Sequence, residues 1–388
     1  MTGTVPVLGA TEAHAAALAG LSGMTPVRLA KVTDGFTPVT AWKALQAGAH
    51  PGDPGRRFAA AARGTDVGAV AARYAAEGVA VLVPGAAGYP GRLVGDPGAP
   101  AVLFALGDPS VMEGAPRVAI VGTRSATPYG RQVASELAAD LAGQGVVVIS
   151  GLAKGIDAAA HAGALGRDEE GAGSPVAVVG TGLDQVYPES SRRLWEEVAA
   201  TGAVLAESPL GTRAHPGVFP ARNRIIAALS DVVVVVESHH RGGSLYTAEA
   251  AARRGIPVCA VPGSVKSASS AGANALLVDG CIPVRDAADV LVAVSLAGAG
   301  PPTRPPKGSP SSPRFRRASP AGEPRAVPAP VLTAGQRSVL EALDETPTPF
   351  ETVLLRTDLS VAEAAQACDE LVDRGLADSG AGWWSRRS

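Results

Sequence analysis

The sequence predicts an α/β protein built on a Rossmann-like, doubly wound, mostly parallel sheet. Between residues 118 and 261, short apolar runs rich in β-branched residues alternate with segments of helical periodicity. Residues 118–121 form one such run, and a glycine-bearing turn, a helical pattern and a second apolar run follow it, as in a βαβ unit. Residues 232–237 are almost wholly valine, so we expect them to lie in the middle of the sheet.

Each element is predicted from a local signal. The predicted strands are residues 79–83, 101–107, 118–121, 146–149, 176–179, 203–207, 232–237 and 258–261. Thr127 and Pro128 are residue types of an N-cap and a first helical turn, and the helix that follows them ends at the glycines 143 and 145. Further helices are expected through Leu194 and Val198, over 219–229, after 242–244 and over 287–296.

Four regions are expected along the chain. Residues 1–75 form a small helical domain, either a cap on the next domain, which the sequence favours, or a helix-hairpin-like module that holds a nucleic-acid backbone. Residues 76–296 form the Rossmann-like domain. Residues 297–330 have the Pro-, Ser-, Ala- and Gly-rich composition of a flexible basic linker. Residues 331–388 are predicted to form three helices and a terminal hairpin, which fits a winged-helix domain.

Composition indicates a globular protein of two or three domains. The 388 residues are 46% hydrophobic and 18% charged, which is enough apolar material for a real core. Three scattered cysteines form neither a disulfide framework nor a metal pair and fit a reducing compartment. No apolar run approaches membrane-spanning length and no secretion signal begins the chain, so a cytoplasmic protein without membrane insertion is expected.

Charge is unevenly distributed. The net charge is +2 for residues 1–80, −4 for 81–296, +5 for 297–330 and −5 for 331–388. Any nucleic-acid contact must therefore come from a local cluster and not from a broad basic field. The acidity of the C-terminal region argues against strong DNA binding there and favours a regulatory or partner-binding role.

Residues 122–127 form a turn suited to an anion, because small residues, hydroxyls, amides at a helix start and one guanidinium meet there. The turn lacks the G-x-G-x-x-G fingerprint, so a phosphate is expected and not NAD. The alternative is that Gly122 only makes a tight turn and Arg124 is a solvated charge. Three more loops, 150–157, 219–224 and 241–247, carry lysine or arginine and should reach the same sheet edge, which suits a run of phosphates.

Signals for catalysis and metal binding are weaker. No G-x-S-x-G, H-E-x-x-H or Walker sequence occurs. His161 is expected to be structural, with a general base as the alternative. Glu207 is either a catalytic carboxylate or the partner of Arg222 or Arg224, and the sequence favours the partner. We therefore expect no metal and no cofactor.

One loop offers an enzymatic alternative. Residues 241–249 are similar to the P-G-G-x-G-T-x-x-E loop of the phosphoribohydrolases, which cleave nucleoside monophosphates. Here Arg241 replaces the proline, the second loop glycine is missing, and the spacing to Thr247 and Glu249 is one residue longer. The alternative function is therefore a nucleoside-monophosphate phosphoribohydrolase-like enzyme that uses residues 242–249.

Six motifs together resemble the DNA-processing protein A family (DprA, also called Smf). They read AIVGTRSATPYG, SGLAKGIDAAAH, VVGTGLDQVYPE, FPARNRIIAALSDVVVVVES, GGSLYTAEAAARRG and AVPG, and they cover roughly residues 80–290 in order. The resemblance implies a Rossmann-like, dimeric protein that binds single-stranded DNA, protects incoming strands and loads the RecA recombinase during natural transformation and recombination. It implies no established enzymatic turnover.

The same resemblance assigns binding residues by motif. Gly122, Thr123 and Arg124 would hold a backbone phosphate, with Arg124 as the principal charge, and Phe219 would stack on a base. The residues expected to contact DNA or its phosphates are Gly122, Thr123, Arg124, Thr127, Ser150, Gly151, Lys154, Phe219, Arg222, Asn223, Arg224, Gly243, Ser244 and Thr247.

A dimer region is also assigned by resemblance. Residues 271–281 correspond to the family's G-x-N-x-L-I-x-x-G-A segment and depart from it at Cys281. Asn274, Leu276 and Leu277 are therefore expected at a homodimer interface.

Overall fold

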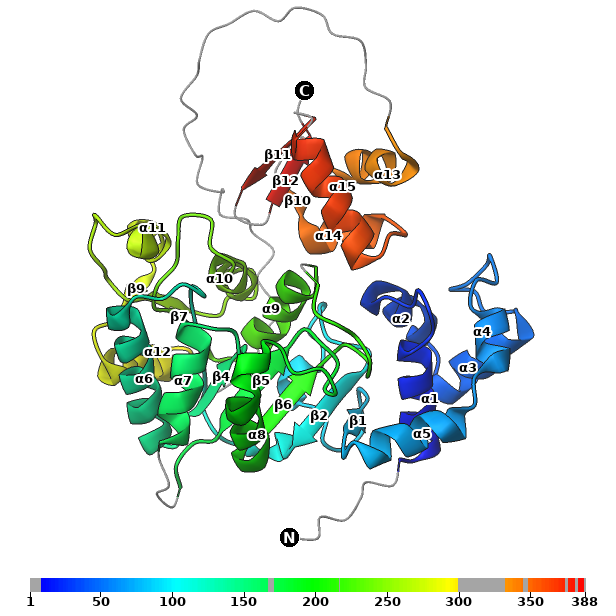
Figure 1. Cartoon of the computed structure of the whole chain (residues 1–388), viewed down its shortest axis with the longest axis horizontal. Coiled ribbons are helices and arrows are strands. Elements are labelled where there is room, and N and C mark those ends of the chain that lie inside the picture. Colours follow the sequence, from blue (N-terminus) through cyan, green and yellow to red (C-terminus); the bar gives the residue numbers. More distant parts are fainter. Residues whose placement is uncertain are drawn as a thin grey trace, which may run out of the picture.

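The computed structural model describes residues 8–166, 171–215, 217–298, 332–344, 348–373, 376–380 and 383–386. A central sheet carries helices on both faces (Figure 1). The N-terminal helices lie at one end of this sheet, and the C-terminal helices lie beyond the sheet edge that α9 (Val218–Leu229) and α10 (Ser244–Ala252) border.

Nine strands form one sheet in the order β1-β2-β6-β5-β4-β3-β7-β8-β9. Neighbours from β6 to β9 run parallel, whereas β2 is antiparallel to both β1 and β6. The strands are β1 (Ala80–Leu82), β2 (Leu103–Gly107), β3 (Arg117–Val121), β4 (Val147–Ser150), β5 (Pro175–Val179), β6 (Ala203–Ala206), β7 (Val232–Val235), β8 (Val258–Ala260) and β9 (Ile282–Pro283). The predicted Rossmann-like α/β class is confirmed, and the valine-rich β7 lies inside the sheet, buried on both faces.

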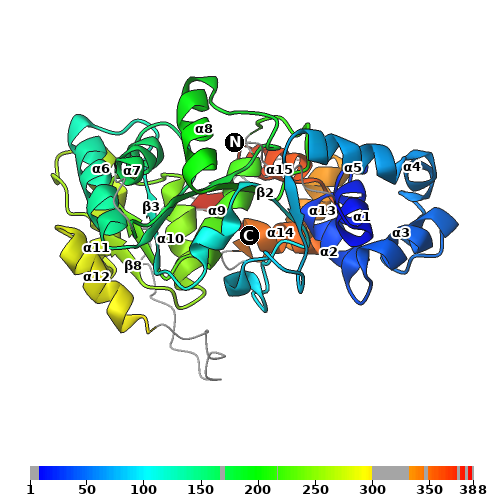
Figure 2. The ribbon, with the colours of Figure 1, turned by 90° about the horizontal axis from the view of Figure 1, so that it is seen from below.

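Two layers of helices cover the sheet. They are α6 (Pro128–Gly143), α7 (Ile156–Leu165), α8 (Arg192–Thr201), α9, α10, α11 (Ala271–Val278) and α12 (Ala287–Leu296). Helices α6, α7 and α12 share a core with Val118 and Ile120 of β3, and α9 and α10 share a core with the alternate residues Ala119 and Val121. Figure 2 shows the sheet between α8 and α10. Successive side chains of β3 therefore point to opposite faces of the sheet and pack against the helix layer on each face.

The N-terminal helices pack directly on the sheet. They are α1 (Ala10–Ala19), α2 (Pro26–Thr33), α3 (Pro38–Ala47), α4 (Ala59–Gly64) and α5 (Val67–Ala76). Leu18, Trp42 and Phe58 belong to one buried cluster with Phe104 of β2 and Val204 of β6. This is the packing of a helical cap.

The described residues from 332 to 386, here called the C-terminal unit, have a core of their own. The unit contains α13 (Ala334–Ala342), α14 (Phe350–Arg356), α15 (Val361–Asp373) and a sheet in the order β10-β12-β11, made of β10 (Thr348–Pro349), β11 (Ala377–Gly380) and β12 (Trp383–Arg386). Phe350, Val353 and Leu371 are buried in that core. Three helices and a terminal hairpin lie where they are predicted, and the winged-helix assignment stays a prediction.

The connection order creates a crevice at the carboxyl end of the sheet. From β3 the chain moves outward through β4, β5 and β6, and then returns to the other side of β3 at β7. The loops after β3 and β7 therefore both leave the carboxyl end of the sheet, and they turn toward opposite sides. The crevice between two such loops is where doubly wound sheets bind ligands. Thr127 is the N-cap of α6 as predicted, because its Oγ1 accepts a hydrogen bond from Gly130 N at 3.1 Å.

Several elements lie outside the sequence expectations, among them α1, α4, α5, α11, β9 and β10. The helices α4 and α5 are alanine-rich, and only Tyr74 is buried in α5, so they carry no clear apolar stripe. Helix α11 lies in the expected dimer region, and β9 is a two-residue edge strand on β8. Such short elements are formed by tertiary pairing and not by local periodicity.

Candidate nucleic-acid interface

The turn after β3 leads into α6, and the chain itself supplies an anion there. The carboxylate of Glu237, which is 1% exposed, accepts hydrogen bonds from Thr127 N at 2.9 Å and Thr127 Oγ1 at 2.6 Å. Gly130 must be glycine, because a Cβ there would lie 2.3 Å from the carboxylate carbon. The N-terminus of α6 is therefore already neutralised, and Thr127 is not free to bind a phosphate as expected.

The amides of the same turn also have internal partners. Thr123 N donates to Glu237 O at 2.7 Å, and Gly122 N donates to the carboxylate of Asp157 in the first turn of α7. Burial raises the pKa of Asp157, and the nearby guanidiniums of Arg222 and Arg124 oppose this shift. Because both amides are engaged, the turn presents its charge to solvent through the Arg124 side chain.

Arg222 is the buried centre of the edge. It is 6% exposed, and its guanidinium donates to Val178 O. A Cβ at Gly151 would lie 1.8 Å from Arg222 Nη1, so the arginine packs directly on that glycine. The pKa of Arg222 is lowered to about 10, chiefly by burial. The guanidinium of Arg124 also lowers this pKa, whereas the carboxylate of Asp157 opposes the shift. Two guanidiniums and one carboxylate thus share one cluster, which carries a net positive charge.

Two predicted residues are buried at the same edge. Ser150 is 0% exposed and its hydroxyl donates to Ile120 O at 2.7 Å. His161 is also 0% exposed, and burial together with Arg222 lowers its pKa to about 3. The imidazole is therefore neutral at pH 7, and both side chains stay inside the fold.

Arg124 also belongs to a stack with two aromatic rings, of which the central one, Phe219, is half-buried. Arg124 Cζ lies 4.4 Å from the ring centroid of Phe219, and the centroid of Tyr187 lies 5.5 Å from that of Phe219. Arg124 is exposed and Tyr187 is 44% exposed. One cation and two aromatic rings in a row can bind phosphates and bases together.

The remaining predicted residues divide into two groups. Lys154 is exposed, and Asn223 Nδ2 donates to Gly243 O at 3.1 Å, which joins the start of α9 to the loop before α10. Ser244 and Thr247 are instead buried, and Ser244 Oγ donates to a neighbouring serine hydroxyl at 2.9 Å. Ser244 therefore holds the loop from inside, and Thr247 is enclosed beside it.

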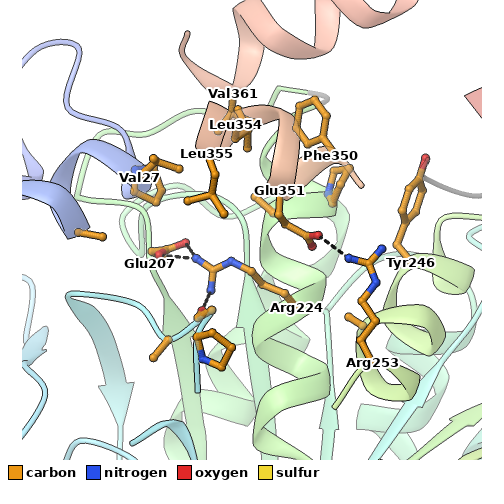
Figure 3. A pocket seen from close by; sticks show the side chains of 18 of the residues that line it. Val27, Glu207, Arg224, Tyr246, Arg253, Phe350, Glu351, Leu354, Leu355 and Val361 are labelled. Carbon is orange, nitrogen blue, oxygen red and sulfur yellow. Dashed lines mark hydrogen bonds and ion pairs between the residues drawn. The ribbon is translucent and has the colours of Figure 1, made fainter. Parts of the chain in front are cut away.

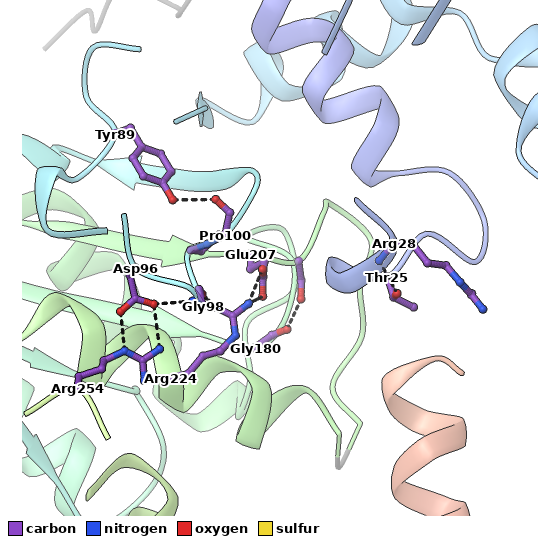
Figure 4. Close-up of polar contacts among 11 residues, drawn as sticks. Thr25, Arg28, Tyr89, Asp96, Gly98, Pro100, Gly180, Glu207, Arg224 and Arg254 are labelled. Carbon is purple, nitrogen blue, oxygen red and sulfur yellow. Dashed lines mark hydrogen bonds and ion pairs between the residues drawn. The ribbon is translucent and has the colours of Figure 1, made fainter. Parts of the chain in front are cut away.

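Arg224 has a different environment from Arg222. Its Nη2 lies 2.6 Å from both carboxylate oxygens of Glu207, and Nη1 donates to Gly98 O (Figure 4). The side chains of Arg224 and Glu207 are 13% and 11% exposed. Glu207 is thus an ion-pair partner, as the sequence favours, and it pairs with Arg224. A guanidinium neutralised in this way is a structural group, in contrast to its expected place among the DNA contacts.

Glu249 lies in a separate environment. It pairs with Arg253 at 3.0 Å and lines a cavity of about 310 Å³ between α10 and the C-terminal unit (Figure 3). Gly243, Ser244 and Thr247 are not among the residues that line it. The carboxylate and the loop that a phosphoribohydrolase-like reaction needs therefore do not meet in this cavity.

Two residues of the edge have no local signal in the sequence. The sequence places Glu237 only as the last residue of the predicted strand 232–237, and the structure buries its carboxylate beneath the turn at Thr127. Tyr187 stands inside the quoted segment VVGTGLDQVYPE, but only its contact with Phe219 gives it a place in the stack. Both depend on segments far apart in the chain.

The predicted dimer residues are only partly available. Asn274 Oδ1 accepts a hydrogen bond from Gly263 N, and Asn274 Nδ2 donates to Gly263 O, both at 3.1 Å. The side chain therefore holds a loop of its own chain. Leu276 and Leu277 are half-buried against the sheet core, and Val278 beside them is 87% exposed. The homodimer stays a prediction.

Three further observations concern membranes, metals and thiols. Across the residues that the structure describes, no helix has both the length and the apolar character to cross a bilayer. In the same residues, no group of three or more His, Cys, Asp or Glu side chains could hold a metal ion. Burial raises the pKa of Cys259 and of Cys368 to about 12, so both thiols stay protonated at pH 7.

Comparison with known proteins gives consistent relatives. A family model described as DNA recombination-mediator protein A matches residues 80–295. DNA processing protein DprA of Bacillus subtilis (strain 168) is 35% identical over 221 residues, which are 57% of this chain and 73% of that protein. Protein Smf of Synechocystis sp. is 32% identical over 309 residues, which are 76% of this chain and 77% of that protein.

A solved structure shares the fold. The X-ray structure of DNA processing protein A (DprA) from Streptococcus pneumoniae is 31% identical, with a TM-score of 0.62, and the match covers 74% of this chain and 98% of that one. The family model spans more than half of the chain and includes all nine strands of the large sheet together with Arg124, Tyr187 and Phe219. The chain therefore belongs to the DNA recombination-mediator protein A family.

Proposed function

We propose that this protein binds single-stranded DNA at the Arg124–Phe219–Tyr187 stack, protects incoming strands, and loads the RecA recombinase in DNA uptake, natural transformation and recombination. The observation that carries the proposal is the row of one guanidinium and two rings, in which Arg124 and Tyr187 are exposed and Phe219 between them is half-buried. A single strand offers its base faces to such rings, whereas a duplex keeps them stacked inside. The proposed work is binding, without a chemical step, in the cytoplasm.

Phosphate binding in this proposal depends on two neighbouring turns. A Cβ at Gly155 would lie 2.7 Å from Arg124 O, so the turn with Lys154 packs against the turn with Arg124. Two exposed cations on adjacent turns suit consecutive phosphates. The other predicted residues shape this surface from within the edge, namely Gly122, Thr123, Thr127, Ser150, Gly151, Arg222, Asn223, Gly243, Ser244 and Thr247.

Two substitutions test the stack. Phe219→Ala removes the central ring and should weaken binding to an oligo-dT strand by about tenfold or more, because one stacked base contributes about 1–3 kcal/mol. Arg124→Ala should lower both the affinity and its salt dependence, by about 0.7 in the log–log slope for one lost phosphate contact. Fluorescence anisotropy titrations at two or more salt concentrations measure both quantities.

A matched control separates this site from general charge. Arg193 is an exposed arginine on α8 whose partner is Glu197 at 2.8 Å. Arg193→Ala removes the same charge elsewhere and should leave affinity and slope at the parent values. An Arg124→Ala protein with the parent's affinity and slope contradicts the proposal.

RecA loading needs its own measurement. The lag before RecA hydrolyses ATP on a single strand reports filament assembly, and loading predicts a shorter lag when this protein is added. Arg124→Ala should restore the long lag, because a mediator that does not hold the strand cannot deliver it. An equal lag with and without the parent protein contradicts the loading role.

We also propose that the homodimer forms at the sheet edge where β9 lies. Val278 on α11 is 87% exposed, and Val292 and Leu296 on α12 are 59% and 78% exposed. Burying apolar side chains of this size drives association. Val278→Asp should shift the protein toward monomer in analytical ultracentrifugation, and a parent protein that is monomeric at all concentrations contradicts the dimer.

A further inference from the structure

Arg253, the residue that follows α10, makes two contacts with the C-terminal unit. Arg253 Nη1 lies 3.4 Å from Glu351 Oε2 of α14, and Arg253 Cζ lies 4.0 Å from the ring centroid of Trp383 in β12. Figure 3 shows this pairing at the rim of the cavity between the two parts. One side chain thus makes an ion pair and a cation–π contact across the boundary.

A second contact joins the unit to the N-terminal helices. Lys31 of α2 lies 3.7 Å from Asp358. The pKa of Glu363 is lowered chiefly by hydrogen bonds from Ser360, and Arg28 and Arg57 add to this shift. The residues that meet here are therefore basic on one side and acidic on the other, in agreement with net charges of +2 for residues 1–80 and −5 for 331–388.

Apolar contacts make the docking specific. Val27 of α2 packs against the core cluster of the C-terminal unit. A Cβ at Gly217, the residue before α9, would lie 2.6 Å from Val361 Cγ1. The unit therefore reaches the start of α9, and Phe219 of the stack is only two residues further along the chain.

The boundary is nevertheless loosely packed. It contains the cavity of about 310 Å³ and a second of about 450 Å³, which Arg222, Leu29 and Val361 help to line. Both cavities are partly open to solvent, so the boundary is not close-packed in the way that a protein interior is. The two ion pairs are solvent-exposed, with side-chain exposures of 34% and 41% for Arg253–Glu351 and 49% and 88% for Lys31–Asp358, so each is weak and salt-sensitive.

We propose that the C-terminal unit is an internal acidic competitor for the nucleic-acid strand. In the docked position its residues 360–362 line the cavity that Arg222 also lines, so a strand that extends from the stack into this cavity requires the unit to leave. The inference rests on the proposed function and names the regulation of that same site. The apparent affinity is then the intrinsic affinity multiplied by the open fraction, and salt or phosphates shift this fraction by competing for the same cations.

A reversible lock tests the proposal in the full chain. The double variant Gly217→Cys/Val361→Cys, made with Cys281→Ser because Cys281 is the half-buried native thiol, brings two Cβ atoms within reach of a disulfide. The oxidised protein should bind oligo-dT about tenfold or more weakly than the same protein after reduction. The single variant Val361→Cys in the same background, which cannot form the lock, should bind equally in both redox states.

A charge reversal tests the opposite state. Glu351→Arg places two cations together at Arg253 and should open the molecule, seen without DNA as a larger radius of gyration in small-angle scattering. Binding should then tighten by about threefold or more. Glu341→Arg makes the same charge change at an exposed position of α13 and serves as the control, because it should leave the radius of gyration unchanged.

The outcomes separate the two proposals. Equal affinities of the locked and reduced proteins overturn the competition, as does a Glu351→Arg protein that gains no more affinity than Glu341→Arg. A parent and reduced protein that never bind a single strand refute the proposed function, and the competition falls with it. Scattering distinguishes these failures, because it reports opening without DNA.

Discussion

Arg124 and Arg224 lie at the same end of the sheet in opposite surroundings. Arg124 is exposed, stacks on Phe219 and shares a cluster with a second guanidinium. Arg224 is 13% exposed and lies 2.6 Å from both oxygens of Glu207. A cation that faces a buried carboxylate holds the fold, whereas a cation that faces solvent and an aromatic ring can attract a phosphate. Residue type alone does not separate the two roles.

The largest effect on stability is expected at the ion pair between Arg224 and Glu207. Glu207→Ala leaves a buried guanidinium without its partner and should lower the free energy of unfolding by about 3–5 kcal/mol. Urea denaturation followed by circular dichroism measures the change. The double variant Glu207→Ala/Arg224→Met, which removes both charges, should recover most of the loss. A Glu207→Ala protein as stable as the parent would make Arg224 an ordinary surface charge.

Gly151→Ala tests the close packing beneath Arg222. The added Cβ would lie 1.8 Å from Arg222 Nη1, so the guanidinium or the strand end has to move. We expect a loss of about 1–3 kcal/mol in unfolding free energy together with weaker strand binding. Gly64→Ala in α4 is the matched control, because nothing lies within 4 Å of a Cβ there and the residue is not part of the proposed site. Equal effects of both substitutions would contradict the role assigned to Gly151.

A pH dependence is expected from the boundary between the two parts. Burial raises the pKa of Glu249 to about 7, and Arg253 opposes this shift. The folded protein therefore holds this proton more tightly than the unfolded chain, so the stability from this group is complete below about pH 4.5 and is lost as the pH rises to about 7. The groups around it are Tyr246, Arg253, Glu351, Glu207, Arg224 and Arg254.

Glu249→Gln measures this dependence. The variant has no proton to lose, so its unfolding free energy should change less between pH 5 and pH 8 than that of the parent. The difference should be about 1 kcal/mol, because solvent screens the partly exposed carboxylate. Urea denaturation at the two pH values is the measurement, and identical pH profiles would contradict a raised pKa.

The smallest effect on stability is expected at Arg124. Arg124→Ala should change the unfolding free energy by less than about 0.5 kcal/mol, since the side chain is exposed and pairs with no carboxylate at hydrogen-bonding distance among the described contacts. The same variant should weaken strand binding. A destabilisation as large as that of Glu207→Ala would show that Arg124 is structural.

The main sheet could be predicted because its strands carry their signal locally. Residues 118–121 and 232–237 are apolar runs that end at small or polar residues, and β3 and β7 form there as parallel inner strands. Thr127 and Pro128 marked the start of α6 for the same reason. The edge strand β9 pairs only two residues and was missed, because nothing in its own sequence requires a strand.

The site was predicted less completely. The segments that carry Arg124, Lys154 and Arg222 were identified, because each places basic residues after a strand or at the start of a helix. The anion at the start of α6 was expected to be a bound phosphate, and it is the carboxylate of Glu237, which lies 110 residues away from Thr127. Periodicity cannot show such a contact, because it depends on the register between β3 and β7.

The amino-acid sequence by itself determined the α/β class, the order of the strands along the chain and the basic turns at their ends, because hydrophobic periodicity and turn chemistry act over a few residues. Only the tertiary structure decided which cation is neutralised, which rings stack, and where the acidic C-terminal unit docks. Those outcomes depend on distances between segments that are remote in the chain, and electrostatic interactions and burial are set by such distances.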